Sequence, residues 1–307
     1  MPFDVNGPLF ERLGLQGLAR SLRWGCSELG HALTGRNRLA RAAQAQFVQR
    51  LADPWFDLGQ LGLHREDVPI LVELNGDLLW LPGDLLKFIW HTRVLSTAAW
   101  TPRFLAETEH YCYVRKRLLP GQTVLDCGAN IGLFTTMMAR CVGDSGAVFA
   151  FEPSPVAAAD LRRVLVLNQR ANVQVVTSAI SDKVGSVTFV EVDTPDVRRE
   201  GSQLLALDGR SDGVPNREIQ VSTTTLDAFC SEHHIKPDLI KIDIEGAELM
   251  ALDGGQSVIA SYRPVLVIEI HPDRAGHFDH ERLLKYLCAY GYRYRWKGKT
   301  YYCEARR

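Results

Sequence analysis

The chain has 307 residues, of which 46% are hydrophobic and 23% are charged, as expected for a globular protein with a buried core. Its 35 lysines and arginines nearly balance 36 aspartates and glutamates, so no overall positive field attracts nucleic acid or an anionic surface. This length exceeds that of one common core and predicts a main domain with an extension.

The cysteines and the N-terminal sequence both indicate a cytoplasmic protein. Seven cysteines are scattered along the chain without a C-x-x-C pair, which argues against a disulfide framework and a structural zinc site. The first residues, MPFDVNGPLF, contain Asp4 and lack the basic flank and apolar core of a secretion signal. Because no apolar run is long enough to cross a bilayer, we also predict no membrane span.

Residues 1–60 show a helical pattern in which leucines are spaced among arginines. The first fifty residues contain seven arginines and three acids, a formal charge of +4 (7 − 3). One interpretation is a solvated helical pair that packs on the main domain or on a second copy of the chain. The other is a cap over an active site, with arginines that meet an anionic substrate.

Two apolar runs between Pro69 and Leu81 flank Asn75-Gly76, a dipeptide in which both residues can adopt positive φ. This pattern predicts a β-hairpin. We place the domain boundary after it. Residues 1–100 form an extension that acts as a cap or in oligomerisation, and residues 101–307 form the main domain.

The sequence TVLDCGANIGLFTT, from Thr123 to Thr136, predicts a strand, a tight turn and a helix. Gly128 and Gly132 allow the backbone to approach a ligand closely, and the helix start offers unpaired N–H groups. The dinucleotide pattern G-x-G-x-x-G is not met, because Asn130 stands at the second glycine position. The turn therefore argues against a nicotinamide-dependent oxidoreductase, which is the alternative enzyme class.

The chain then continues with alternating strands and helices. Glu152 ends the second strand, where a doubly wound fold places an acid that binds ribose hydroxyls. The segment 194–217 is rich in proline, glycine, aspartate and arginine, and is either a lid or a disordered insertion. The expected strands are Ala147–Phe151, Val173–Thr177, Val187–Val192, Leu239–Ile244 and Val265–Ile270, and the expected helices are Val156–Arg170, Thr225–His233 and His280–Tyr290.

A closing hairpin, Tyr292–Trp296 with Thr300–Cys303, completes the pattern. We therefore predict an α/β fold with a doubly wound, mostly parallel seven-stranded sheet and an antiparallel C-terminal hairpin. The helical N-terminal extension and the first β-hairpin precede this sheet.

Charged residues mark the end of the fourth strand. Lys241, Asp243 and Glu245 alternate with apolar residues, so we expect all three to point to one side. Buried charges are costly unless they pair or act, and ligands bind at strand carboxyl ends in such sheets. We expect Asp243 to face the cofactor or substrate and Glu245 the substrate. A structural pair between Lys241 and one of these acids is the alternative.

Glu269 and His271 repeat this arrangement at the end of the fifth strand. A histidine beside a carboxylate can act as a general base near neutral pH, with Glu269 as a possible orienting partner. A strand-end histidine without a role is the alternative. The four side chains of Asp243, Glu245, Glu269 and His271 could hold magnesium, but their spacing does not demand it, and we predict no metal site.

Six sequence blocks, taken together, resemble the FkbM-type family of S-adenosylmethionine (SAM) dependent methyltransferases. The resemblance covers about residues 120–271. The blocks are VLDCGANIG, VFAFEPSP, AISD, TTLDAF, LIKIDIEGAEL and PVLVIEIH. This resemblance implies a class I, Rossmann-like enzyme that methylates a hydroxyl group of a sugar, glycoside or polyketide-type metabolite. A non-catalytic SAM-binding domain is the other alternative, and the polar strand ends argue against it.

The candidate partners and site residues follow from the resemblance together with the N-terminal and strand-end patterns described above. The partners would be a small-molecule or glycosidic substrate and, through the N-terminal extension, a second copy of the chain. The candidate catalytic residues are His271, Asp243, Glu269 and Glu245. The candidate SAM-binding residues are Asp126, Gly128, Ala129, Asn130 and Gly132 on the methionine and ribose side, Glu152 at the ribose diol, Ser178, Ala179 and Ile180 at the adenine, and Asp243 at the amino group.

Overall fold

The structure is a computed structural model. It describes residues 69–74, 77–82, 85, 108–192, 203–204, 216–272 and 276–306. The chain divides into two units, residues 1–112 and 113–307. The helices expected in residues 1–60 and most of the predicted lid lie outside the described residues. The predicted domain boundary after residue 100 and the role of the extension stay predictions.

The first unit contains the predicted hairpin. Strands β1 (Pro69–Leu74) and β2 (Asp77–Pro82) pair antiparallel, with Leu74 opposite Asp77. Within this unit, the hydroxyl of Tyr111 donates a hydrogen bond of 2.9 Å to the buried carboxylate of Asp77. The expectation of a hairpin at this position is confirmed.

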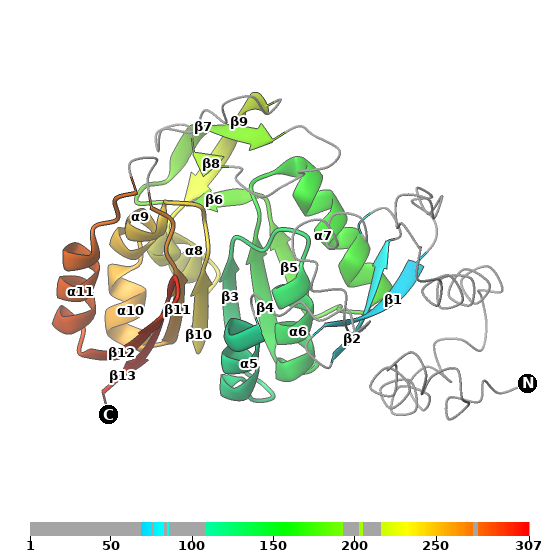
Figure 1. Cartoon of the computed structure of the whole chain (residues 1–307), viewed down its shortest axis with the longest axis horizontal. Helices are drawn as coiled ribbons and strands as arrows, with labels where there is room; N and C mark the ends of the chain where they lie inside the picture. Colours follow the sequence, from blue (N-terminus) through cyan, green and yellow to red (C-terminus); the bar gives the residue numbers. More distant parts are fainter. Residues whose placement is uncertain are drawn as a thin grey trace, which may run out of the picture. The chain divides into compact units, whose positions relative to one another are not determined.

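The second unit is built on a seven-stranded sheet with the order β12-β13-β11-β10-β3-β4-β5 (Figure 1). Strands β5, β4, β3, β10 and β11 run parallel, whereas β13 runs antiparallel to β11 and to β12. This confirms the predicted fold class and the closing hairpin. The strand bounds are β3 Thr123–Cys127, β4 Ala147–Phe151, β5 Val173–Val176, β10 Leu239–Ile242, β11 Val265–Glu269, β12 Tyr292–Lys297 and β13 Thr300–Ala305.

Helices cover both faces of this sheet. Neighbouring residues of a strand point to opposite sides, so apolar side chains on both faces need a covering layer. Ala150 packs with Leu161 and Leu165 of one helix, whereas Phe151 belongs to the core formed with four other helices. The helix with Leu161 is α7 (Pro155–Leu167), and the other four are α8 (Leu226–Glu232), α9 (Glu248–Asp253), α10 (Gln256–Tyr262) and α11 (His280–Ala289). Helix α5 (Thr108–Arg117) precedes β3, and α6 (Leu133–Val142) follows it.

A second, four-stranded sheet was not predicted. Its order is β6-β9-β7-β8, and it pairs segments that lie far apart in the sequence. Val221 of β9 and Phe189 of β7 bury their side chains in a cluster with Ala247, which precedes α9. The strands are β6 Ser178–Ile180, β7 Gly185–Val192, β8 Gln203–Leu204 and β9 Asn216–Thr224. Residues 203–204 and 216–217 of the segment predicted as a lid or a disordered insertion thus belong to strands, so the disordered alternative is wrong at those residues.

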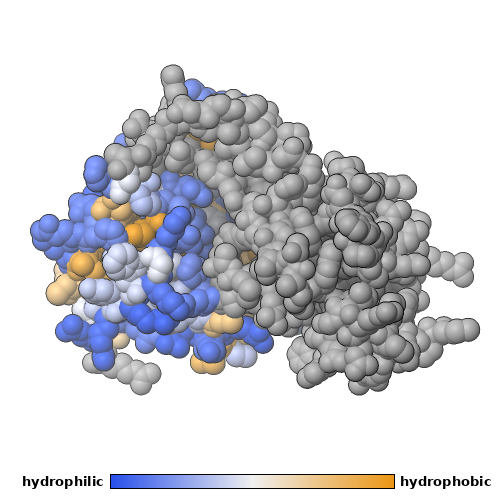
Figure 2. All heavy atoms as spheres, viewed as in Figure 1, coloured by the Kyte–Doolittle hydropathy of each residue, from blue (hydrophilic) through white to orange (hydrophobic). Residues whose placement is uncertain are grey.

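The described surface is mainly hydrophilic on the face that Figure 2 shows, with apolar residues in small separate patches. Among the described helices, none combines the length and the apolar character that a membrane crossing requires.

Candidate active site

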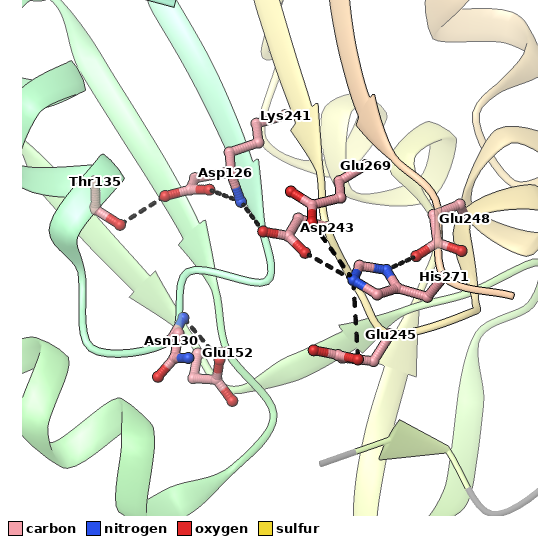
Figure 3. A network of polar contacts seen from close by, with 10 residues as sticks. All are labelled: Asp126, Asn130, Thr135, Glu152, Lys241, Asp243, Glu245, Glu248, Glu269 and His271. Atoms are coloured by element: carbon pink, nitrogen blue, oxygen red, sulfur yellow. Dashed lines mark hydrogen bonds and ion pairs between the residues drawn. The ribbon is translucent and has the colours of Figure 1, made fainter. Parts of the chain in front are cut away.

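Polar side chains gather at the carboxyl ends of β3, β4, β10 and β11 (Figure 3). The order of the sheet explains this arrangement, because β10 lies between β3 and β11, and β3 lies beside β4. Parallel strands end at the same edge of a sheet, so residues from distant segments meet there. The structure thus brings the residues predicted at the strand ends into one region.

The turn after β3 is held in a tight conformation by the end of β4. The N–H groups of Gly128 and Ala129 both donate to the carbonyl oxygen of Phe151 at 3.0 Å. Gly128, with φ of 85°, has backbone geometry that favours glycine. A Cβ atom there would lie 1.7 Å from the carbonyl oxygen of Asp243, so the turn and the end of β10 touch through their backbones.

Glu152 ties this turn to the end of β4. One carboxylate oxygen accepts the N–H of Asn130 at 2.9 Å, and the other accepts the N–H of Ser154 at 2.9 Å. Burial raises the pKa of Glu152 to about 7, although these two backbone hydrogen bonds oppose the shift. The carboxylate that was predicted to bind ribose hydroxyls is therefore buried and fixed in orientation.

The residues predicted to border an adenine lie in the second sheet. Ser178, Ala179 and Ile180 form β6, which contacts β4. Ala179 and Ile180 are buried, and the hydroxyl oxygen of Ser178 lies 2.8 Å from that of Ser222. Their role at a cofactor stays a prediction.

Lys241 forms the structural pair that the sequence left open. Its Nζ lies 2.9 Å from Asp243 Oδ2 and 3.7 Å from Asp126 Oδ1. Register explains the second contact, since Lys241 of β10 stands beside Asp126 of β3. Burial raises the pKa of Asp126, and both Lys241 and the Thr135 hydroxyl, which donates to Asp126 at 2.6 Å, act against this shift.

The predicted continuous strand up to Ile244 is wrong, because β10 ends at Ile242. Asp243 and Glu245 lie in the turn that follows, and Glu245 adopts a φ of 53°. A left-handed glutamate costs about 1 to 2 kcal/mol relative to an ordinary conformation. The turn nevertheless carries both carboxylates toward His271.

His271 stands among four carboxylates. Its Nδ1 lies 2.9 Å from Glu248 Oε1, which is hydrogen-bond distance. Its Nε2 lies 3.8 Å from Asp243 Oδ1, 3.9 Å from Glu245 Oε2 and 3.9 Å from Glu269 Oε1. Burial of the ring opposes its charged form, but the hydrogen bond to Glu248 and the surrounding negative charges win and raise the pKa of His271 to about 9.

Glu248 is the residue that sequence reasoning missed. The expected orienting partner of His271 was Glu269, but the hydrogen bond is made by Glu248, which is fully buried. The sequence shows Glu248 within EGAEL, directly after the polar end of the fourth strand. The direction of its side chain could not be predicted, because it depends on the turn at Glu245 and the start of α9.

Asp243, Glu269 and His271 could hold a cation, since one ligand atom from each lies within 4.8 Å of the others. The absence of a functional metal site stays a prediction.

Comparisons with known proteins agree with the sequence blocks. Residues 126–294 match the family model described as Methyltransferase FkbM domain. The chain is similar to 31-O-demethyl-FK506 methyltransferase FkbM from Streptomyces tacrolimicus, with 33% identity over 184 residues that cover 52% of this chain and 70% of that protein. Methyltransferase sdnD from Sordaria araneosa is 29% identical over 174 residues, covering 48% of this chain and 65% of that protein.

Among solved structures, the chain is similar to methyltransferase FkbM from Methylobacillus flagellatus KT, with 19% identity and a TM-score of 0.42. That match covers 64% of this chain and 51% of the other, so the chain spans about half the length of that solved protein.

Proposed function

The chain belongs to the FkbM methyltransferase family, and from this premise we propose that it transfers the methyl group of SAM to a hydroxyl group of a small or glycosidic metabolite. The observation that carries the proposal is that the turn after β3 lies against the polar cluster at the end of β10. The turn after β3 touches the backbone of Asp243, whose carboxylate lies beside His271. A cofactor held at the turn would be next to a possible base.

The residues around the turn fit SAM. Two buried oxygens there, Asp126 Oδ1 and Asn130 Oδ1, make no hydrogen bond within the described part of the chain. Such acceptors suit the amino and hydroxyl groups of a cofactor. Glu152 would hold the ribose diol, because its two oxygens match two adjacent hydroxyls. Asp243 would face the amino group of SAM.

SAM supplies a methyl group bound to a positively charged sulfur, and the remainder leaves as a neutral thioether. The protein then has two tasks, which are to align the acceptor hydroxyl and to remove its proton. We propose that His271 Nε2 accepts the proton of the acceptor hydroxyl. The carboxylates of Asp243, Glu245 and Glu269 stabilise the imidazolium that forms, and Asp243 is the substitute base.

Titration calorimetry tests the cofactor. The folded protein should bind both SAM and its demethylated product, and NADH under the same conditions should give no binding heat. Absence of binding by SAM and by the product would overturn the proposal, and binding of NADH alone would favour an oxidoreductase. A protein that binds SAM but transfers no methyl group to any sugar or polyketide alcohol would be a binding domain.

Glu152→Ala should weaken SAM binding by roughly ten- to a hundred-fold, because hydrogen bonds to a charged group contribute about 1.5 to 3 kcal/mol. With a pKa of about 7, Glu152 loses its charge in mild acid, so wild-type affinity for SAM should fall as the pH drops below 7. The variant should lack this pH dependence.

Asp160→Asn is the matched control, because Asp160 is also a buried acid but is paired with Arg163 on α7. It should leave the affinity for SAM nearly unchanged. If Glu152→Ala bound SAM as tightly as the wild type, the cofactor site would have to lie elsewhere.

A further inference from the structure

Glu248 is a buried acid that the reaction described above does not use. It is the first residue of α9, its side chain is fully buried, and it is held by two contacts. Its Oε1 lies 2.9 Å from His271 Nδ1 and accepts the N–H of Gly246 at 3.0 Å. The same oxygen therefore ties the turn after β10 to the histidine that follows β11.

This contact determines which ring nitrogen carries the proton. A carboxylate offers only acceptors, so the ring nitrogen that faces it has to be a donor. His271 then carries its hydrogen on Nδ1 whenever the ring is neutral. Because a neutral imidazole has one N–H, Nε2 keeps its lone pair.

The surroundings of Nε2 agree with this assignment. The charged groups that face the ring come from three elements, namely Asp243 and Glu245 in the turn after β10, Glu248 at the start of α9 and Glu269 at the end of β11. Among these four described acids, Glu248 alone is at hydrogen-bond distance from the ring. The oxygens of the other three lie 3.8 to 3.9 Å from Nε2, beyond hydrogen-bond distance.

We propose that Glu248 is a positioning residue, which holds His271 in the tautomer whose Nε2 accepts the proton of the substrate hydroxyl. This inference rests on the proposed function for the identity of the proton donor. The hydrogen bond and the tautomer themselves belong to the protein without ligands. In this role Glu248 replaces Glu269, which the sequence indicated.

The tautomer can be measured by the nitrogen chemical shifts of the histidine rings in the ¹⁵N-labelled full chain. At about pH 10, above the pKa of about 9, the wild-type His271 signals should show a protonated Nδ1 and an unprotonated Nε2. The signals are assigned by their absence in His271→Gln. If Nε2 rather than Nδ1 were protonated in the neutral ring of the wild type, this measurement alone would overturn the proposal.

Glu248→Gln should allow the other tautomer, because an amide can donate to Nδ1 as well as accept from it. Glu269→Gln is the matched control, since it removes one carboxylate near the ring but leaves the hydrogen bond to Nδ1 in place. Both variants should lower the pKa of His271 by removing a negative charge. Of these two variants only Glu248→Gln should change the ratio of tautomers. Glu248→Ala removes the acceptor altogether, and an unchanged ratio in both Glu248 variants would overturn the proposal.

Activity provides the second readout. At about pH 10, where the ring is neutral in both proteins, Glu248→Gln should slow single-turnover transfer by about tenfold or more, with SAM affinity preserved and the pH profile displaced to lower pH. An acid with a purely structural role would lower stability and leave the pH profile in place. If no acceptor is methylated even by the wild type, the proposed function fails, while the tautomer measurement still decides the role of Glu248.

Discussion

Replacing His271 with alanine should slow single-turnover methyl transfer by about a hundred-fold or more, because the variant lacks the group that removes the hydroxyl proton. Binding of SAM should be preserved, since the residues proposed to bind the cofactor do not include His271. Rapid-quench measurement of the first turnover, together with titration calorimetry on the same sample, separates these two effects.

The wild-type rate should depend on pH in a direction that follows from the pKa of His271. Only the neutral ring can accept a proton, and the pKa is raised from 6.5 to about 9. The rate should therefore rise with pH and level off near pH 9 rather than near 6.5. At pH 7 roughly 1% of the molecules carry the neutral ring in the absence of ligands.

Asp243 offers the competing assignment, and a pair of variants decides between them. His271→Ala could retain the wild-type rate and pH profile while Asp243→Asn abolishes transfer and still binds SAM. In that case the aspartate is the base and our assignment is wrong. A rate that required added magnesium and disappeared with a chelator would instead assign the cluster to metal binding.

Gly128→Ala should destabilise the protein by about 3 kcal/mol or more and should eliminate SAM binding. A new Cβ atom would lie 1.7 Å from the carbonyl oxygen of Asp243 and 2.8 Å from its carbonyl carbon. These are backbone atoms, so relief requires the turn or the end of β10 to move. Urea denaturation of wild type and variant measures the loss.

Gly143→Ala is the matched control for backbone conformation alone. Gly143 also has a positive φ, 64°, but a Cβ atom there would meet nothing within 4 Å. It should cost about 1 to 3 kcal/mol, the penalty of a backbone conformation (φ 64°, ψ −176°) that is essentially confined to glycine. Equal losses for the two variants would mean that the close approach of Gly128 to Asp243 has no energetic weight.

Much of the main sheet could be predicted because parallel strands buried on both faces are continuous apolar runs. The second strand was predicted with its observed bounds, Ala147–Phe151, and this placed Glu152 at the correct edge. The second sheet was not predicted, since β8 has two residues and β9 pairs with strands that precede a long segment. Long-range pairing of this kind leaves a weak local signal.

Most residues of the candidate site could be predicted from the sequence, but the contacts between their side chains could not. The sequence showed that Asp243 and His271 follow neighbouring strands, and alternation then favoured Glu269 as the partner of the histidine. The turn at Glu245 and the start of α9 bring Glu248 to Nδ1 instead. The raised pKa of His271 was also missed, because it depends on the carboxylates of Glu248, Glu245 and Asp243, which only the folded chain brings together.

The packing of the second sheet limits which of its positions can be exchanged without disturbing the candidate site. Phe189 and Val221 on its inner side are buried with Ala247, the residue directly before Glu248. Exchanging the whole sheet for that of a relative would disturb the turn that holds this acid. A graft should therefore retain the inner apolar side chains and vary exposed positions such as Gln220. The outer surface of the sheet can therefore be varied more freely than its inner surface, whose buried side chains pack against the residue before Glu248.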